Sequence, residues 1–363
     1  MGPPLWLFSS SGSETEVTVR RNRAVFERLA LMPRVLRNVT SCELDTTFLG
    51  HRLSLPVMLA PIGPIVTFHP EGALGPARAA DEAGTISFVG GRSDPDLEEV
   101  RGSSRGPLVF QLYVYGDRPW VARLVKRVED AGYDALCVTV DSPDPALGDR
   151  YFQSDFEAQR RQGSLPNLER MPGETSLPRG MGQTNRHFGA FTWDDLVWLR
   201  DTTRLPLILK GVLSPKDAEL AVSCGVSAIH VSNHGGRRQD QLPATLEVLP
   251  QVISAVGDRA EVIVDGGFLR GTDVVKALAM GARAVLVGRL MIWALAAGGD
   301  AGIVRMLEIL RREIRATMTN VGCSTVDDLT SELVVPSFQP PVTPWPIEPL
   351  GQRETNAQDG WVT

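Results

Sequence analysis

Residues 228–243, with the sequence AIHVSNHGGRRQDQLP, place a histidine and two arginines directly behind a short apolar run. The apolar part is typical of a buried strand, so His234 and Arg237 come where that strand ends. A histidine exchanges protons near neutral pH, and an arginine binds anions through paired N–H donors. The glycines between them allow backbone conformations that other residues avoid. The stretch therefore indicates a tight turn that carries chemically active side chains.

Polar side chains also follow most of the other apolar runs. Lys210 is unusual among them, because a buried ammonium needs a negative partner. One histidine behind a strand is more often structural, but a whole set at strand ends is hard to explain that way. If the strands are parallel, their carboxyl ends share one face and these side chains share one site. The set is Gln111, Tyr113, Thr139, Asp141, Lys210, His234, Arg237, Asp265 and Arg289.

Two glycine-containing stretches, 265–271 (DGGFLRG) and 287–289 (VGR), indicate a phosphate site. They follow the last two apolar runs, and in barrels the loops after these strands commonly hold phosphate. Backbone N–H groups around Gly266 and Gly267 can reach a phosphate, and Arg289 can hold it with two donors. Glycines that only make turns are the alternative for each stretch alone. Together the two stretches favour a phosphorylated ligand or cofactor.

The elements that must position these residues are short apolar runs separated by segments of helical period. This alternation predicts right-handed β-α-β units and a parallel sheet. Eight runs in about 250 residues predict an α/β fold of the (β/α)8 class, a TIM barrel. An open doubly wound sheet is the alternative, which we rank lower because no Gly-x-Gly-x-x-Gly follows the first run. The runs are 57–61, 85–89, 108–113, 135–141, 206–211, 228–232, 261–267 and 284–288.

Two segments interrupt or follow the alternation. Residues 142–190, after the fourth run, are rich in Gly, Pro and charge, and we expect them to form a polar lid over the barrel mouth. Residues 336–363 are Pro-rich, and we expect a disordered tail. The barrel domain is thus predicted to span residues 1–335.

Composition limits the class of protein further. A net charge of −6 with mixed signs argues against a nucleic-acid binder, which needs a basic face. No apolar run has the roughly 18 residues of a membrane span. The N-terminus lacks the basic region of a signal peptide, and the four cysteines show no metal-ligand spacing. We therefore expect a cytoplasmic protein with reduced thiols, no metal site and no membrane partner.

Several of these stretches resemble the family of FMN-dependent 2-hydroxy acid oxidases and dehydrogenases, which includes glycolate oxidase, lactate oxidase and mandelate dehydrogenase. The resemblance covers about residues 11–329 and rests on SNHGGRRQD, QLYVYGDR, VTVDSP, LILKGV and DGGFLRGTDVVKALAMGARAVLVGR. It implies a TIM barrel that binds FMN and oxidises a 2-hydroxy acid to a 2-oxo acid. O2 would reoxidise the flavin and give H2O2, and a homotetramer is the expected assembly.

The resemblance also implies roles for the substrate side of the site. His234 would be the base that takes a proton from the substrate, and Asp141 would hydrogen-bond its imidazole. Arg237, together with Arg150 from the lid, would pair with the substrate carboxylate. Tyr113 would donate a hydrogen bond to the substrate.

On the cofactor side, Lys210 would lie near flavin N1 and O2, where negative charge builds on reduction, and this charge is the partner that a buried lysine needs. Gln111 and Thr139 would hydrogen-bond the polar edge of the flavin ring. The other residues that match the cofactor-binding positions are Ala60, Pro61, Ile62, Ser232, Asp265, Gly266, Gly267, Gly288 and Arg289.

The chain departs from the family at several positions. Phe8 replaces a tyrosine that contacts the substrate carboxylate, and Arg92 stands where an aromatic residue is common. Gly90 lacks a hydroxyl near the flavin, and Leu269 replaces an arginine that helps bind the phosphate. We expect weaker FMN binding than in relatives. We also expect a substrate larger than lactate, with a polar or acidic group beyond the hydroxy acid, which Phe8 and Arg92 would contact. An Arg92 that faces solvent or pairs with a nearby aspartate is the alternative.

Other functions remain open from the sequence. Within the same family, a 2-hydroxy acid dehydrogenase or a monooxygenase that decarboxylates its product is possible. The polar lid and the lack of a preceding haem domain favour the oxidase. An FMN-binding barrel isomerase is a rival from another class, but His234, Arg237 and Tyr113 together argue against it. An inactive flavin-binding scaffold is the third possibility, and Phe8 and Leu269 would allow it.

Overall fold

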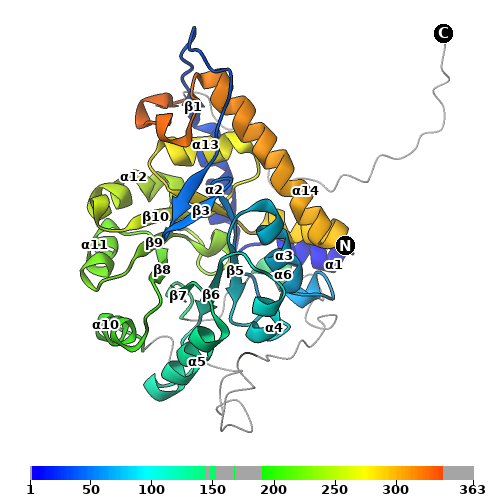
Figure 1. The fold of residues 1–363 in the computed structure, drawn as a ribbon, viewed down its shortest axis with the longest axis vertical. Helices are drawn as coiled ribbons and strands as arrows, with labels where there is room; N and C mark the ends of the chain where they lie inside the picture. Colours follow the sequence, from blue (N-terminus) through cyan, green and yellow to red (C-terminus); the bar gives the residue numbers. More distant parts are fainter. Residues whose placement is uncertain (1, 144–147, 153–166, 168–189, 338–363) are drawn as a thin grey trace, which may run out of the picture.

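The computed structural model describes residues 2–143, 148–152, 167 and 190–337 (Figure 1). Most of the predicted lid, 142–190, and almost all of the predicted tail, 336–363, lie outside the described residues. The described part of the lid consists of residues 142–143, 148–152, 167 and 190, and it includes the short helix α6 (Asp149–Phe152).

A closed barrel of eight parallel strands forms the body of the molecule, in the order β4-β5-β6-β7-β8-β9-β10-β11 and back to β4. This is the predicted (β/α)8 barrel, and each predicted run overlaps one of the strands. Helices alternate with them: α3 (Leu74–Ala83), α4 (Leu97–Gly102), α5 (Arg118–Ala131), α10 (Trp193–Thr202), α11 (Pro215–Ser223), α12 (Thr245–Val256), α13 (Gly271–Ala279) and α14 (Arg289–Val321). The strands are β4 (Val57–Leu59), β5 (Ser87–Gly90), β6 (Leu108–Leu112), β7 (Ala135–Thr139), β8 (Leu207–Val212), β9 (Ala228–Val231), β10 (Glu261–Val264) and β11 (Ala284–Val287).

Alternate residues of the strands face opposite sides, as the period of two requires. One set fills the barrel interior with apolar side chains such as Phe88, Val109 and Ile263. The other set packs outward against the helices, and this packing forms the larger apolar core. Because apolar residues fill the interior, polar side chains gather at the barrel ends.

A β-hairpin, β2 (Thr46–Phe48) and β3 (His51–Leu53), covers the amino ends of the barrel strands. Phe48 and Leu53 belong to the interior apolar cluster. The backbone N–H of Leu49 donates to Glu261 Oε2, at the start of β10, over 2.6 Å. The apolar hairpin closes this end of the barrel, so the polar site must lie at the other.

The N-terminal segment lies over the opposite, carboxyl ends of the strands. It contains α1 (Pro3–Ser10) and α2 (Val17–Glu27), neither of which we predicted from the sequence. Helix α2 contacts the turn η2 (His234–Gly236), and α1 contacts α6 and α14. Strand β1 (Leu29–Leu31) then pairs antiparallel with β12 (Val334–Pro336), near the end of the described chain.

Helix α14 is the last helix of the barrel and packs along α3 and α13 (orange in Figure 1). Its backbone leaves helical geometry at Gly298 and Gly299, where φ reaches 62° at Gly299. In the described part of the chain it is the one helix whose length and composition would suit a membrane span. Here its Leu295, Ile303 and Leu307 are instead buried against the barrel.

Candidate active site

A cavity of about 510 Å³ opens at the carboxyl ends of the barrel strands, beneath the N-terminal segment. Its size is within the usual range of small-molecule sites. Four of the predicted residues are not on its wall, although each forms a hydrogen bond or ion pair that is described below: Thr139, Asp141, Arg150 and Ser232. The predicted residues on its wall are Phe8, Ala60, Pro61, Ile62, Arg92, Gln111, Tyr113, Lys210, His234, Arg237, Asp265, Gly266, Gly267, Gly288 and Arg289.

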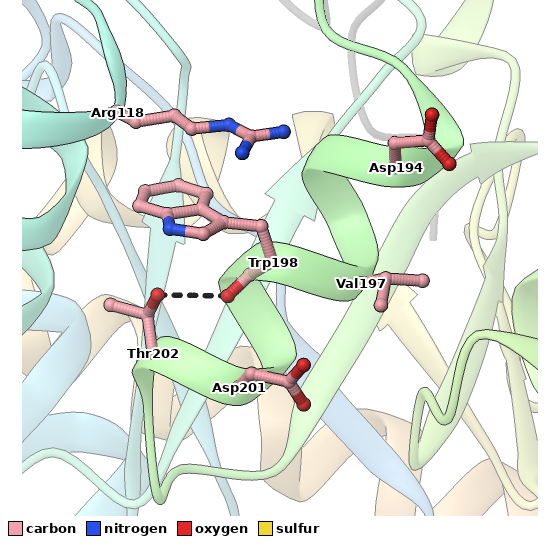
Figure 2. Close-up of a pocket in the computed structure, with 6 residues that line it drawn as sticks. All are labelled: Arg118, Asp194, Val197, Trp198, Asp201 and Thr202. Carbon is pink, nitrogen blue, oxygen red and sulfur yellow. Dashed lines mark hydrogen bonds between the residues drawn. The ribbon is translucent and has the colours of Figure 1, made fainter.

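A second hollow, of about 620 Å³, lies beside α10 and away from the barrel mouth. Figure 2 shows the Arg118 guanidinium lying over the Trp198 ring, at 5.2 Å from its centre. Arg118 also forms an ion pair with Asp195 over 2.7 Å, so its charge is already balanced. The hollow also has Asp194, Asp201 and Thr202 on its wall, but all three are exposed to solvent. Because buried and paired polar groups gather at the barrel mouth instead, that cavity is the better candidate for an active site.

His234 and Asp141 form the reactive pair of the cavity. His234 Nδ1 lies 2.8 Å from Asp141 Oδ1, and Ser142 Oγ donates to the same oxygen over 3.0 Å. The close approach depends on Gly211, since a Cβ there would lie 2.6 Å from that of Asp141. Because the carboxylate only accepts hydrogen bonds, we assign the imidazole proton to Nδ1. The lone pair of Nε2 then points toward the Tyr113 hydroxyl, 3.5 Å away.

The pKa values of this pair suit a base and its partner. Burial disfavours the charged imidazole and lowers the pKa of His234 to about 4, although Asp141 opposes the shift. For Asp141, burial favours the neutral carboxyl, but His234 and Lys210 outweigh it and hold the pKa well below its usual range. At neutral pH the imidazole is therefore neutral and the carboxylate charged, which leaves Nε2 ready to accept a proton.

Arg237 comes from the same turn as His234. Its guanidinium lies 4.7 Å from the centre of the Phe8 ring and donates to the carbonyl oxygens of Phe8 and Ser11, over 2.7 and 3.1 Å. Burial, together with the charges of Arg289 and Arg238, lowers the pKa of Arg237 to about 9, so it stays charged at neutral pH. Among the described residues, no carboxylate forms an ion pair with this half-buried guanidinium, so it is suited to binding an anion.

Arg150, in α6, reaches the same region from the predicted lid. Its Nη2 donates to Ser10 Oγ over 2.7 Å, and its Nη1 pairs with Glu16 Oε2 over 3.4 Å. Its buried Nε has no hydrogen-bond partner among the described residues. The structure thus places Arg150 against the N-terminal segment, beside the cavity wall rather than on it.

Lys210 and its neighbours form the cavity floor. Lys210 Nζ donates to Ser232 Oγ over 3.0 Å, and Ser232 Oγ donates to Asp265 Oδ2 over 2.9 Å. Asp141 Oδ2 lies 3.6 Å from the same ammonium. Burial disfavours the charged lysine, but Asp141 and Asp265 outweigh it and raise the pKa of Lys210. The floor therefore presents a cation that remains charged at neutral pH.

Beside this floor, Gln111 Nε2 donates to Thr139 Oγ1 over 2.7 Å. This bond holds the Gln111 amide at the wall of the cavity, where its carbonyl oxygen and second N–H are available to a ligand. Both residues are buried, so a polar ligand edge would meet a fixed partner.

The predicted phosphate region lies at the far side of the cavity, where Gly266 and Gly267 adopt φ values of 102° and 87°. A Cβ at Gly267 would lie 2.3 Å from the carbonyl oxygen of Asn22, so only glycine fits beneath α2. Arg289 begins α14 and donates to the carbonyl oxygens of Ser11 and Gly235, over 3.0 and 2.8 Å. Burial lowers its pKa to about 10, and the side chain stays charged.

These residues fit FMN. The Lys210 ammonium would supply a cation for the flavin ring, and the Arg289 guanidinium would supply one for the phosphate. Gln111 would hydrogen-bond the polar edge of the ring. Gly266 and Gly267 bring backbone to the cavity wall, and a Cβ at either position would collide with Thr245 or Asn22. The volume, the charges and the donor types therefore agree with a phosphorylated, planar, polar cofactor.

The four departures from the family occupy defined places. Phe8 stacks on Phe68, with ring centres 6.1 Å apart, and shields Arg237. A Cβ at Gly90 would lie 3.1 Å from Ser93 Oγ, so the glycine is closely packed. Leu269 lies on the cavity wall and brings no charge there. Arg92 also lies on the wall, and its charge acts on the nearby Tyr115.

Several residues of the site were missed in the sequence. Arg238 lies on the cavity wall near Tyr115. Asn22 and Asn233 exchange two hydrogen bonds of 2.9 and 2.8 Å, which join α2 to the His234 turn. His230 lies below the cavity floor, 3.1 Å from Asp265 Oδ2. A signal existed for His230, because a histidine interrupts an otherwise apolar strand two residues before Ser232.

The fold and the site define a flavin-binding barrel enzyme. The chain matches the family model of FMN-dependent dehydrogenases over residues 1–336. It is 43% identical to the L-lactate oxidase of Nostoc sp., with 89% of this chain and 91% of that protein covered. It is 38% identical to the glycolate oxidase of Spinacia oleracea, with 92% of each chain covered.

Solved structures of mandelate oxidase and mandelate dehydrogenase also match this chain over most of its length. Mandelate oxidase with (S)-2-phenylpropionate matches with a TM-score of 0.81 at 35% identity, covering 93% of this chain and 94% of that one. A variant of the active chimera of (S)-mandelate dehydrogenase matches with a TM-score of 0.86 at 31% identity, covering 93% and 96%. The chain belongs to the FMN-dependent dehydrogenase family, and FMN is its cofactor.

Proposed function

We propose that this protein oxidises a 2-hydroxy acid to the 2-oxo acid, with O2 as the final electron acceptor and H2O2 as a product. The observation that carries the proposal is the pairing, in one turn, of a neutral imidazole and a charged guanidinium at the cavity. Bound FMN supplies the acceptor for the two electrons removed from the substrate. The similarity to lactate, glycolate and mandelate oxidases supports O2 over a protein acceptor.

The chain's own residues handle the proton and the carboxylate. Arg237 binds the substrate carboxylate, and this contact orients the hydroxyl-bearing carbon toward His234. His234 Nε2 takes a proton from the substrate, and Asp141 stabilises the imidazolium that results. Tyr113, whose hydroxyl lies 3.5 Å from Nε2, orients the substrate beside the base. The N-terminal segment covers the cavity and limits the access of water.

We further propose that the substrate is larger than lactate and carries a polar or acidic group beyond its hydroxy acid. Arg92 and Arg238 both lie on the cavity wall, and both act on Tyr115. In the part of the chain that the structure describes, neither forms an ion pair with a carboxylate. Since Arg237 suits the substrate carboxylate and Arg289 the phosphate, these two cations are available for a further anionic group.

The test compares kcat/KM for lactate, mandelate and a hydroxy diacid, with H2O2 measured by a coupled peroxidase. We expect wild type to prefer the diacid to lactate. Arg92→Trp should lower that ratio by about tenfold, as loss of one charged hydrogen bond does, while the exposed Arg105→Gln leaves it unchanged. An unchanged ratio in Arg92→Trp would remove Arg92 from substrate recognition. Turnover without H2O2 would instead favour a dehydrogenase or a decarboxylating monooxygenase.

A further inference from the structure

His230 is a fully buried histidine below the floor of the cavity. Its neighbours Ile229 and Val231 belong to the outer apolar core, whereas Ala228 belongs to the interior cluster, so His230 faces the inside of the barrel. Its side chain is 0% exposed, and its ring meets the Phe88 ring edge-on at 6.2 Å. An imidazole in such an apolar layer is unfavourable unless its polar atoms are bonded.

The partner of His230 is Asp265. Nε2 lies 3.1 Å from Asp265 Oδ2, the same oxygen that accepts the hydrogen bond from Ser232. Neither ring nitrogen forms a hydrogen bond of good geometry with a described residue, so the 3.1 Å approach of Nε2 to Asp265 is the one polar contact of this ring within the described chain. Burial disfavours the charged ring and lowers the pKa of His230, with Asp265 opposing the shift. A neutral imidazole has one N–H, and because the carboxylate can only accept, that N–H belongs at Nε2.

The contact affects how the charges of the floor are arranged. Asp265 and Lys210 carry opposite charges, yet within the described chain Ser232 bridges them and no direct ion pair joins them. His230 is the lateral neighbour of Lys210 in the sheet, so both side chains face the inside of the barrel. Oδ2 therefore has Ser232 Oγ as its donor and His230 Nε2 as a close neighbour, while Oδ1 has no hydrogen-bond partner among the described residues.

We propose that His230 is a positioning residue for the FMN site, which holds Asp265 in place through the 3.1 Å contact at Nε2, together with Ser232, so that the Lys210 ammonium stays directed at the cavity. It acts through Asp265 and touches neither substrate nor cofactor in this assignment. The inference rests on FMN as cofactor and is independent of which substrate is oxidised. No known part of the reaction requires an imidazole at this position.

The test measures sulfite affinity of the FMN-loaded protein, which reports how well the site holds negative charge on the flavin and needs no turnover. In His230→Leu, Asp265 loses one donor and turns toward Lys210, so the ammonium is partly neutralised. Losing a hydrogen bond to a charged group changes an equilibrium by roughly tenfold. We therefore expect sulfite affinity to fall about tenfold. His230→Gln keeps an N–H donor and should stay within about threefold of wild type.

Ile263→Val is the matched control. Ile263 pairs with His230 in the sheet and belongs to the same interior cluster, but it carries no polar group. It should lower the urea midpoint and leave sulfite affinity unchanged. The proposal is overturned if His230→Leu binds sulfite within twofold of wild type, or if His230→Gln loses as much affinity as His230→Leu. If His230→Leu does not fold, ¹⁵N NMR of wild type decides: a proton on Nδ1 instead of Nε2 overturns the assignment.

Discussion

At the scale of single residues, Asp141 connects the two halves of the site. One of its oxygens lies 2.8 Å from His234 Nδ1, and the other lies 3.6 Å from Lys210 Nζ. The same carboxylate therefore stabilises the imidazolium that forms when His234 takes a proton and keeps a buried ammonium charged. Proton transfer and stabilisation of the flavin charge are coupled through this one side chain.

Replacing Lys210 tests whether its buried ammonium stabilises negative charge on the flavin. In Lys210→Met, Asp141 and Asp265 remain near the cavity floor without the buried cation. Removing one partner of a buried ion pair costs about 3–5 kcal/mol, so sulfite affinity should fall at least about a hundredfold and the flavin midpoint potential should drop. Lys216→Met, on the exposed face of α11, is the control and should change neither. An unchanged potential in Lys210→Met would mean that the ammonium is not beside the flavin.

The pH dependence tests His234 as the base. Burial lowers its pKa to about 4, and a protonated imidazole cannot accept a proton. The active form is therefore present above pH 4 and is lost as the pH falls through that value. The acid limb of log kcat/KM, which reports the free enzyme, should bend near pH 4 and well below the ordinary histidine value of about 6.5. A bend at 6.5 would show that burial does not control this group.

At the scale of elements, the N-terminal segment completes the site. Asp240, just after the His234 turn, accepts from the backbone N–H groups of Thr18 and Val17, over 2.7 and 3.1 Å. It thereby satisfies the free donors at the start of α2, the role of a helix cap. The paired amides of Asn22 and Asn233 add a second attachment. Helix α2 is thus held on the barrel by these polar contacts as well as by its buried Val19, Val25 and Phe26.

Asp240→Ala should therefore loosen α2. Loss of a cap costs about 0.5–2 kcal/mol, which urea unfolding will measure, and FMN affinity should fall because α2 covers Gly267. Burial raises the pKa of Asp240, but the backbone N–H of Thr18 and other donors outweigh it and lower the pKa. This stabilisation is present above pH 4 and lost as the pH falls below it, so wild type and variant should converge in acid. Exposed Asp258→Ala is the control.

The barrel was predictable from the sequence, and the attachment of α2 was not. Each barrel strand is a local apolar run with turn residues at its ends, so its position can be predicted from residues that are close together in the sequence. The run 261–267 was predicted too long, because the positive φ values at Gly266 and Gly267 end β10 at Val264. Helix α2 depends on Asp240 and Asn233, more than 200 residues away. The role of His230 could not be predicted either, because it depends on contact with Asp265, which follows the neighbouring strand of the barrel.

At the scale of the whole molecule, the charge is distributed unevenly. The chain carries a net charge of −6, yet the active-site cavity is lined by Arg23, Arg92, Lys210, Arg237, Arg238 and Arg289, with Asp265 as an opposing charge. A cavity of one sign with apolar walls concentrates ligands of the opposite sign. An anionic cofactor and an anionic substrate match this field, and they account for the burial of several arginines that would otherwise be unfavourable.

The most direct test is to mix FMN-loaded protein with a panel of 2-hydroxy acids in the absence of oxygen and to follow the flavin absorbance. We predict that at least one acid bleaches the flavin and that O2 then restores the colour with formation of H2O2. His234→Gln should retain FMN and bleach about 10²–10⁴ times more slowly, the usual contribution of a general base. A bound flavin that no 2-hydroxy acid bleaches, or a His234→Gln variant within about threefold of wild type, would contradict the account.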